Sequence, residues 1–408
     1  MTLVARPRVF KKAIRLLGPL LCRCILLLTK TTVMLKTIYI SCFCLILSSL
    51  VRAQNIDTTA KKADTSKAAA PAPPALSITG SADMYYRYDF NRPRTAPYNS
   101  LTSFTQSHDQ AQLGMATVKL EHKTAKMDMV ADLGFGKRAQ DFDYADYAPP
   151  FGTGGGGILQ AIKQLYISYS PASWIKFTGG TWATHIGYEV VDAYANRNYS
   201  MSYMFTNGPF SHTGLRADLT SGKNGFMIGI SNPTDYRIIP EGAQNNKDLI
   251  AQYSYAASDN FKLYLNYVGG RDIADNKVHQ YDLVLNTKLT GTFGIGANGT
   301  VNVSSAKVGD TYDASKTWYG AAAYLLLDPK PWFGLTLREE YFSDKDGVKI
   351  PGGANIFAST LTASFKVDGF TFMPEFRLDN ANNGIFGKHD GTTTKTDGSF
   401  LIAAVYSF

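Results

Sequence analysis

The chain has 408 residues, a formal net charge of +8 and four cysteines. Nine of its 41 Lys and Arg residues lie within residues 1–53, which contain no Asp or Glu, so the remainder has 32 bases against 33 acids. A near-neutral body excludes the basic surface that nucleic-acid binding requires, and no nucleic-acid partner is expected. All four cysteines also lie within residues 1–53, which excludes disulfides and cysteine metal sites from the body.

Residues 1–53 are predicted to be a signal or leader region. From Met34 onward, a basic residue precedes an apolar stretch over residues 38–50, and small residues that suit signal peptidase end at Ala53. The apolar stretch is shorter than the roughly 20 residues that a transmembrane helix needs. Two explanations of residues 1–33 stay open: either Met34 is the true start, or an unusually long leader carries an anchor.

Residues 54–75 are rich in Ala, Pro and Lys, and residues 76–408 in Tyr, Phe, Gly, Asn and Thr. The first stretch cannot bury a core and is predicted to be a periplasmic linker. In the body, the period is two: over residues 78–90 apolar side chains alternate with polar ones, and the same pattern returns over 127–135, 293–303 and 370–379. This period is typical of strands, and the length of the first segment suits a tilted membrane strand of about 9–11 residues with an extension.

Short turns and long loops alternate along this body. Short turns are predicted at 123–126, 170–173, 221–224, 257–260, 290–292, 328–331 and 368–369. Long loops are predicted at 91–110, 137–159, 184–212, 232–247, 270–279, 304–316, 343–354 and 380–398. Seven turns and eight loops imply sixteen strands, with 14–18 still possible because two strands are weakly patterned. Short periplasmic turns and long outer loops are typical of an all-β, antiparallel up-and-down transmembrane β-barrel over residues 76–408.

The last strand alternates up to a terminal aromatic residue, Phe408. Such an ending resembles the signal that the outer-membrane assembly machinery recognises, so this machinery and the outer-membrane lipid are expected partners. Together with the leader, the pattern predicts a protein of the cell outer membrane in a Gram-negative bacterium.

The polar faces of the strands are predicted to line the lumen, because charges exposed to lipid would cost about 2–4 kcal/mol for a base at mid-bilayer. These pore-lining candidates carry both signs: Asp83, Arg87, Asp89, Asp128, Asp132, Arg216, Asp218, Arg338, Glu340, Glu375, Arg377 and Asp379. The alternative is that they form interior salt bridges and plug a narrow barrel. About sixteen strands favour a water-filled channel.

The connection over residues 184–212 is the longest and is dense in aromatic residues. Long ordered loops are usually functional, so it is expected to fold inward and narrow the channel. Glu189, Asp192 and Arg197 are its candidates for setting a field on passing ions. The alternative is that its aromatic residues pack on neighbouring loops as a lid, or form a subunit contact.

No enzyme, cofactor or metal site is expected. The six histidines lack metal-site spacing, the glycines at 154–157 lack the Lys-Ser/Thr of a phosphate loop, and the adjacent Ser211 and His212 have poor geometry for Ser–His catalysis.

Several stretches resemble the OmpL-like β-barrel porins: the opening strand at 83–93, the segments 179–189, 198–200 and 208–214, and the strands at 338–344 and 375–379. The resemblance spans about residues 83–408. It implies an outer-membrane location and a pore role, without catalytic residues or an established substrate.

We therefore expect a porin whose water-filled channel passes small hydrophilic solutes by passive diffusion. A homo-oligomer is one possible assembly of this porin. The alternative is a structural or adhesive outer-membrane barrel with ligand-binding extracellular loops.

Overall fold

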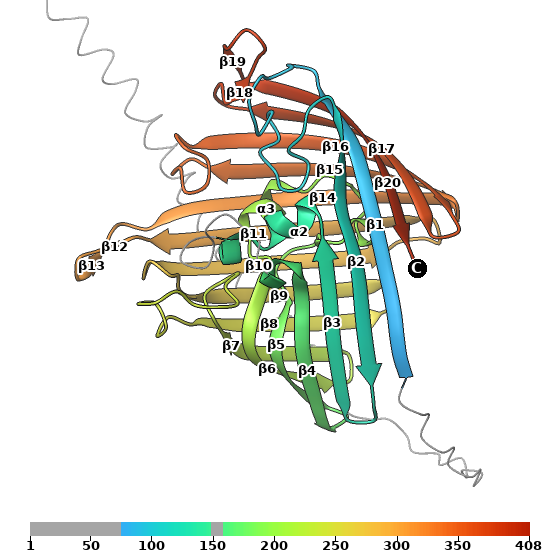
Figure 1. Cartoon of the computed structure of the whole chain (residues 1–408), viewed down its shortest axis with the longest axis vertical. Coiled ribbons are helices and arrows are strands. Elements are labelled where there is room, and N and C mark those ends of the chain that lie inside the picture. Colours follow the sequence, from blue (N-terminus) through green and yellow to red (C-terminus); the bar gives the residue numbers. More distant parts are fainter. Residues whose placement is uncertain (1–74, 148–157) are drawn as a thin grey trace, which may run out of the picture. The chain divides into compact units, whose positions relative to one another are not determined.

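A closed barrel of sixteen antiparallel strands forms the body of the protein (Figure 1). The structure, a computed structural model, describes residues 75–147 and 158–408. The expected fold class and the count of sixteen strands are confirmed. The predicted leader and all of the predicted linker except Ala75 lie outside the described residues, so these two assignments stay predictions.

The strands follow one another around the barrel in chain order. They are β1 (Ala75–Asp89), β2 (Gln110–Lys123), β3 (Met127–Phe135), β4 (Ile162–Ala172), β5 (Ile175–Ala183), β6 (Ser211–Ser221), β7 (Asn224–Ser231), β8 (Asp248–Ser258), β9 (Phe261–Arg271), β10 (Lys277–Lys288), β11 (Phe293–Ser305), β14 (Lys316–Lys330), β15 (Phe333–Asp344), β16 (Ala354–Val367), β17 (Phe370–Ala381) and β20 (Thr396–Ser407).

The last strand closes the barrel against the first. Strand β20 pairs antiparallel with β1, with Met84 opposite Ala404, and it pairs with β17 on its other side. Closure leaves no sheet edge with unpaired backbone groups, which is the condition for a sheet to cross lipid.

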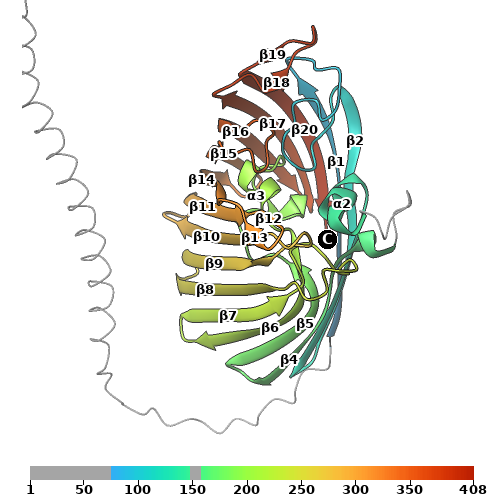
Figure 2. The ribbon, with the colours of Figure 1, turned by 90° about the vertical axis from the view of Figure 1, so that its left-hand side faces the viewer.

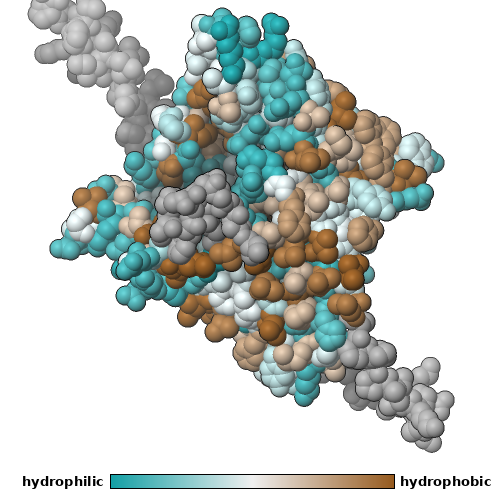
Figure 3. Space-filling view, in the orientation of Figure 1, coloured by the Kyte–Doolittle hydropathy of each residue, from teal (hydrophilic) through white to brown (hydrophobic). Residues whose placement is uncertain are grey.

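Side chains alternate between the outer face and the lumen along the strands, as the period of two predicted. On β17 the side chains of Phe372 and Phe376 are 38% and 45% exposed, whereas Glu375 between them is 2% exposed. Large apolar side chains therefore cover the outer face, and the charged ones on β17 face the lumen. Figure 3 shows hydrophobic residues gathered over the strands, and mostly hydrophilic residues over the projecting loop that carries β12 and β13.

Short turns join the strands at one end of the barrel and long connections join them at the other (Figure 1). Figure 2 looks at the barrel from the side that carries the loop with β12 and β13. The connections contain α2 (Lys137–Phe142), η1 (Tyr144–Tyr147), η2 (Ile158–Ala161), η3 (Ala193–Ala195), α3 (Tyr203–Asn207), β12 (Lys307–Val308), β13 (Thr311–Tyr312), β18 (Phe386–Gly387) and β19 (Thr393–Thr394). Within the described residues, no helix combines the length and apolarity needed to cross a membrane.

Candidate functional site: the segment inside the barrel

The connection from β5 to β6 occupies the lumen, and residues 184–210 of it are called here the inserted segment. Its side chains and backbone hydrogen-bond to Asp83 on β1, Lys163 on β4, Asp282 on β10 and Glu375 on β17. Contacts with strands on all sides of the barrel place the segment inside it, and Figure 1 shows α3 within the ring of strands. The predicted long connection thus lies in the lumen, while its role as a constriction stays a prediction.

Two wall carboxylates hold the backbone of the inserted segment. Glu375 accepts hydrogen bonds from the N–H groups of Tyr199 (2.8 Å) and Ser200 (3.1 Å). Glu340 accepts from the N–H groups of Tyr203 and Met204, both at 2.9 Å. A buried irregular backbone needs partners for its N–H groups, and each carboxylate satisfies two consecutive ones.

Two wall arginines satisfy carbonyl groups of the same stretch. Arg338 donates to the carbonyl of Ser200 at 2.7 Å, and Arg377 donates to the carbonyl of Met201 at 2.8 Å. The segment therefore meets donors and acceptors from the wall in alternation. Hydrogen bonds to ionised groups each contribute about 1.5–3 kcal/mol, so this wall fixes the segment in one position.

Two tyrosines of the inserted segment reach carboxylates on either side of the closure between β1 and β20. The hydroxyl of Tyr199 donates to Asp83 at 2.5 Å, and that of Tyr203 donates to Asp379 at 2.7 Å. Burial beside these carboxylates raises the pKa of both tyrosines, so each stays a neutral donor.

Each predicted constriction residue has a partner of opposite charge. Glu189 lies 2.5 Å from Arg338. Asp192 lies 2.6 Å from Lys163, which also contacts Asp132 at 3.1 Å. Arg197 contacts Asp328 at 2.8 Å, near the turn between β14 and β15. Any field that Glu189, Asp192 and Arg197 apply to ions is that of ion pairs rather than of lone charges.

Nine of the twelve pore-lining candidates are at most 8% exposed: Asp83, Arg87, Asp89, Asp132, Arg338, Glu340, Glu375, Arg377 and Asp379. The other three, Asp128, Arg216 and Asp218, are half-buried. The two alternatives for these residues were open lumen charges and interior salt bridges. In the described barrel, most of these side chains bind the inserted segment, the outer loops or each other, and their pore-lining role stays a prediction.

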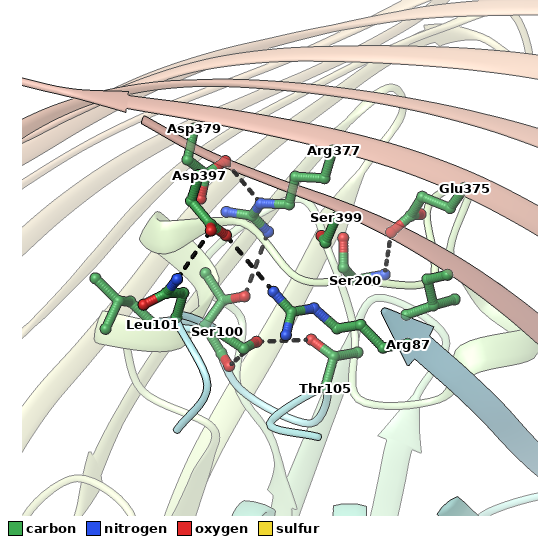
Figure 4. Close-up of a pocket in the computed structure, with 13 residues that line it drawn as sticks. Arg87, Ser100, Leu101, Thr105, Ser200, Glu375, Arg377, Asp379, Asp397 and Ser399 are labelled. Atoms are coloured by element: carbon green, nitrogen blue, oxygen red, sulfur yellow. Dashed lines mark hydrogen bonds and ion pairs between the residues drawn. The ribbon is translucent and has the colours of Figure 1, made fainter. Parts of the chain in front are cut away.

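Figure 4 shows how such charges are used near the outer mouth. On β17, Arg377 forms an ion pair with Asp379, with an Nε–Oδ1 distance of 2.8 Å. Arg87 on β1 points toward Asp397 on β20, with an Nη2–Oδ2 distance of 3.7 Å. The first outer loop completes the cluster, because Asn99 donates to Asp397 at 2.9 Å. The space left between them is about 10 Å³, about the room of one water molecule.

The aromatic residues at the end of the inserted segment pack against outer loops. The ring centroids of Phe205 and Phe210 lie 5.2 Å apart. Their hydrophobic cluster also includes Phe104 from the first loop and Phe142 from α2. Both interpretations of this connection therefore describe part of the structure: it folds inward, and it also packs against neighbouring loops.

Several residues that hold the inserted segment were absent from the sequence-based candidates, among them Arg138, Lys163 and Asp235. Fully buried Arg138 on α2 lies over the ring of Tyr199 at 4.7 Å and donates to the carbonyl of Val191. Lys163 binds Asp192, as described above. Asp235 lies in the loop between β7 and β8.

Asp235 fixes the end of the inserted segment. One of its oxygens accepts from the N–H groups of Phe210 (2.7 Å) and Ser211 (2.8 Å), and the other accepts from the hydroxyl of Tyr144 (2.8 Å). Burial raises the pKa of Asp235 to about 6, although these hydrogen bonds oppose the shift. Burial therefore disfavours the ionised form of the carboxyl that holds this end.

Along β10, one cavity lies on the outer side of the inserted segment and another on its inner side. Between them, Gly187 of the segment donates a hydrogen bond to Asp282. The outer cavity, about 250 Å³, has Gln280 in its lining, and the inner one, about 160 Å³, has Asn286. A third cavity of about 210 Å³ is lined by residues of β1 to β4 and by Phe408. The inserted segment thus divides the free space of the lumen.

Among the described residues, no cluster of three or more His, Cys, Asp or Glu side chains could hold a metal ion. His185 and His212 lie together with ring centroids 5.1 Å apart, and His212 hydrogen-bonds Thr184 at 3.0 Å. These contacts connect the start of the inserted segment to β6.

The family described as "Putative beta-barrel porin-2, OmpL-like" matches residues 75–408 of the chain. No match was found among curated proteins. Similar solved structures include a trimer form of the outer-membrane protein OmpT of Vibrio cholerae, with TM-score 0.52, 10% identity, and coverage of 82% of this chain and 99% of that chain. The outer-membrane channel DcaP of Acinetobacter baumannii has TM-score 0.52 and 9% identity, covering 82% and 97%. An anion-selective porin from Comamonas acidovorans has TM-score 0.54 and 8% identity, covering 82% and 100%.

Proposed function

The chain belongs to the OmpL-like β-barrel porin family, and from this premise we propose that it forms a narrow channel through which small hydrophilic solutes diffuse passively across the outer membrane. The observation that carries the proposal is the inserted segment, which is fixed to the wall by Glu340, Glu375, Arg338 and Arg377 and leaves cavities on both sides. A barrel of this size without such a segment would enclose a wide aqueous channel.

The proposed path runs along the wall of β10 and is narrowest where Gly187 donates to Asp282. Gln280 lines the outer cavity, Asn286 lines the inner one, and Asp282 between them contacts Asn266 and Asn298 at 2.7 and 2.6 Å. Amide side chains offer donors and acceptors without net charge, which suits hydrated polar solutes. The expected absence of enzymatic activity stays a prediction.

Recording from single channels in planar bilayers tests this function. The wild-type protein is expected to give small stepwise currents, and a variant in which residues 188–206 are replaced by a short Gly-Ser linker is expected to give currents several-fold larger. A variant shortened at residues 306–315, in the loop that carries β12 and β13, is the matched control and should conduct like the wild type.

Silence in both the wild type and the 188–206 variant, with both folded, would overturn the channel proposal and favour the structural or adhesive barrel. Equal currents in the two would show that the inserted segment does not limit conduction.

We also propose that the barrel assembles with copies of itself, since a trimer form is described for the structurally similar OmpT. The outer-membrane lipid and the assembly machinery are further proposed partners. A signal peptide that ends at Ala53 would direct the chain toward that membrane.

A further inference from the structure

Glu339 lies on the outer face of the barrel, in contrast to its two neighbours. Arg338 and Glu340 are fully buried and hold the inserted segment, so alternation along β15 turns Glu339 toward the membrane. Its cross-strand partners agree: Ala323 on β14 is exposed, and Ser359 on β16 is half-buried. Ser359 donates to a carboxylate oxygen of Glu339 at 2.6 Å.

This carboxylate lies within the apolar band of the wall. Below it on β15, the outward residues Phe333, Leu335 and Leu337 are apolar, and the next outward residue above it is Tyr341. Away from the strand ends, no other outward-facing position in the described barrel carries Asp, Glu, Lys or Arg. Ionisable groups in a membrane usually face protein or water and have a partner, and acyl chains offer Glu339 none.

The same outer face is hollowed on the strands that precede β15 in the barrel. An open hollow of about 570 Å³ lies over β9, β10, β11 and β14, and Gly299 is in its lining. A Cβ atom added to Gly299 would meet nothing within 4 Å. Ala297, Ala321 and Ala323 surround Gly299 on the same face, because they pair with it or with each other across β11 and β14. Small residues let another protein surface approach closely.

The same face carries donors that suit a carboxylate. Tyr281, Tyr319 and Tyr341 are outward and 52%, 41% and 40% exposed. A second copy inserted in the same orientation would present such hydroxyl groups at a similar depth in the membrane. Anionic lipid phosphates, by contrast, would be repelled by Glu339.

We propose that the outward face of β10, β11, β14, β15 and β16 is the surface through which the barrel binds a second copy of itself, with Glu339 as its polar centre. The proposal rests on the self-assembly proposed above and names its surface. It does not depend on whether the channel conducts. Bilayer recordings therefore test the channel proposal, and assembly measurements test this surface separately.

Native mass spectrometry of full-length protein extracted in mild detergent tests the surface. Ala323→Trp is expected to abolish the oligomer, because a large ring on the small-residue face blocks close approach. Ala131→Trp, on the outward face of β3 across the barrel, is the matched control and should keep the oligomer. Retention of the oligomer by Ala323→Trp, equal loss in both variants, or a monomeric wild type would each overturn the proposal.

Glu339→Leu separates a protein contact from a lipid contact. At a subunit surface, this change is expected to weaken the oligomer, and Glu339→Gln, which keeps an oxygen acceptor, should retain more of it. If Glu339 instead faces lipid, Glu339→Leu would leave assembly unchanged and raise the heat stability of the barrel. That result would overturn the proposal. Comparing boiled and unboiled samples in gels verifies that each variant is folded.

Discussion

Glu189 and Arg338 meet inside the barrel at an oxygen–nitrogen distance of 2.5 Å, and their side chains are 5% and 0% exposed. Removing one partner of a buried pair leaves the other charge uncompensated, at a cost of about 3–5 kcal/mol. Because Arg338 also holds the carbonyl of Ser200, loss of its partner should loosen the inserted segment as well as change the local charge.

Glu189→Gln is therefore expected to shift permeability toward anions and to increase conductance or current noise. The double variant Glu189→Gln/Arg338→Met should recover much of the wild-type ion preference, since both charges are gone. Reversal potentials in a salt gradient measure the preference. If the single and the double variant were equal to the wild type in both quantities, the pair would have no influence on conduction.

The barrel could be predicted because lipid outside and polar groups inside impose a period of two on every strand. Strand β17 illustrates this: Phe376 and Leu378 alternate with Arg377 and Asp379, and the pairing of β17 with β20 follows this register. The alternation of short turns with long loops then determined the number of strands.

The partners of the inserted segment could not be predicted in the same way. Lys163 has the same parity as Leu165 and Ile167, which are outward, so simple alternation would place it in the lipid. The register between β3 and β4 shifts at Asp132, and this bulge turns Lys163 inward to Asp132 and Asp192. Bulges re-aim single side chains, and the sequence alone carries no clear signal for this one.

Arg138 and Asp235 were missed for another reason. Both lie in long connections, where no regular period relates the position of a residue to its burial. Their burial follows from the folding of several loops into one mouth, which depends on contacts between residues distant in sequence.

The paired hydrogen bonds of Glu375 and Glu340 predict a residue-specific pattern of amide exchange. Glu375→Gln is expected to speed exchange at Tyr199 and Ser200, and Glu340→Gln at Tyr203 and Met204, because a neutral amide accepts more weakly than a carboxylate. Hydrogen–deuterium exchange with mass spectrometry measures the rates. Glu121→Gln, on the inward face of β2 beside Lys123, is the control and should leave this segment unchanged. Uniform acceleration in both variants would contradict separate anchors.

Asp235 predicts a pH dependence of stability. Its pKa is raised by burial to about 6, so the folded barrel binds a proton more tightly than the unfolded chain does. The stability that this proton contributes is fully present below about pH 4 and is lost as the pH rises through about 6, a change of roughly 3 kcal/mol for two pKa units. Asp235→Asn should flatten this part of the profile. Urea unfolding of refolded protein at pH 4, 5, 6 and 7 measures it, and parallel profiles for variant and wild type would refute the assignment.

Phe408 has two separable roles, one in packing and one as the predicted assembly signal. A Cβ atom placed on Gly80 would lie only 2.8 Å from the ring of Phe408. The backbones of the two residues exchange hydrogen bonds of 3.1 and 3.0 Å. Gly80→Ala should therefore destabilise the packed barrel, because the new methyl group would also meet the carbonyl of Thr117 at 2.8 Å. The same variant leaves the carboxyl-terminal residue unchanged.

Comparing Gly80→Ala with Phe408→Leu then separates the two roles. Both variants are expected to lower the urea midpoint of protein refolded in detergent, where no assembly machinery is present. If Phe408 is also the signal, Phe408→Leu should reduce the amount of protein in the outer membrane further than its loss of stability explains, whereas Gly80→Ala should follow its stability alone. Phe408→Tyr, which keeps a terminal aromatic ring, should restore most of the level. Outer-membrane amounts that follow the urea midpoint equally in all three variants would limit Phe408 to packing against Gly80.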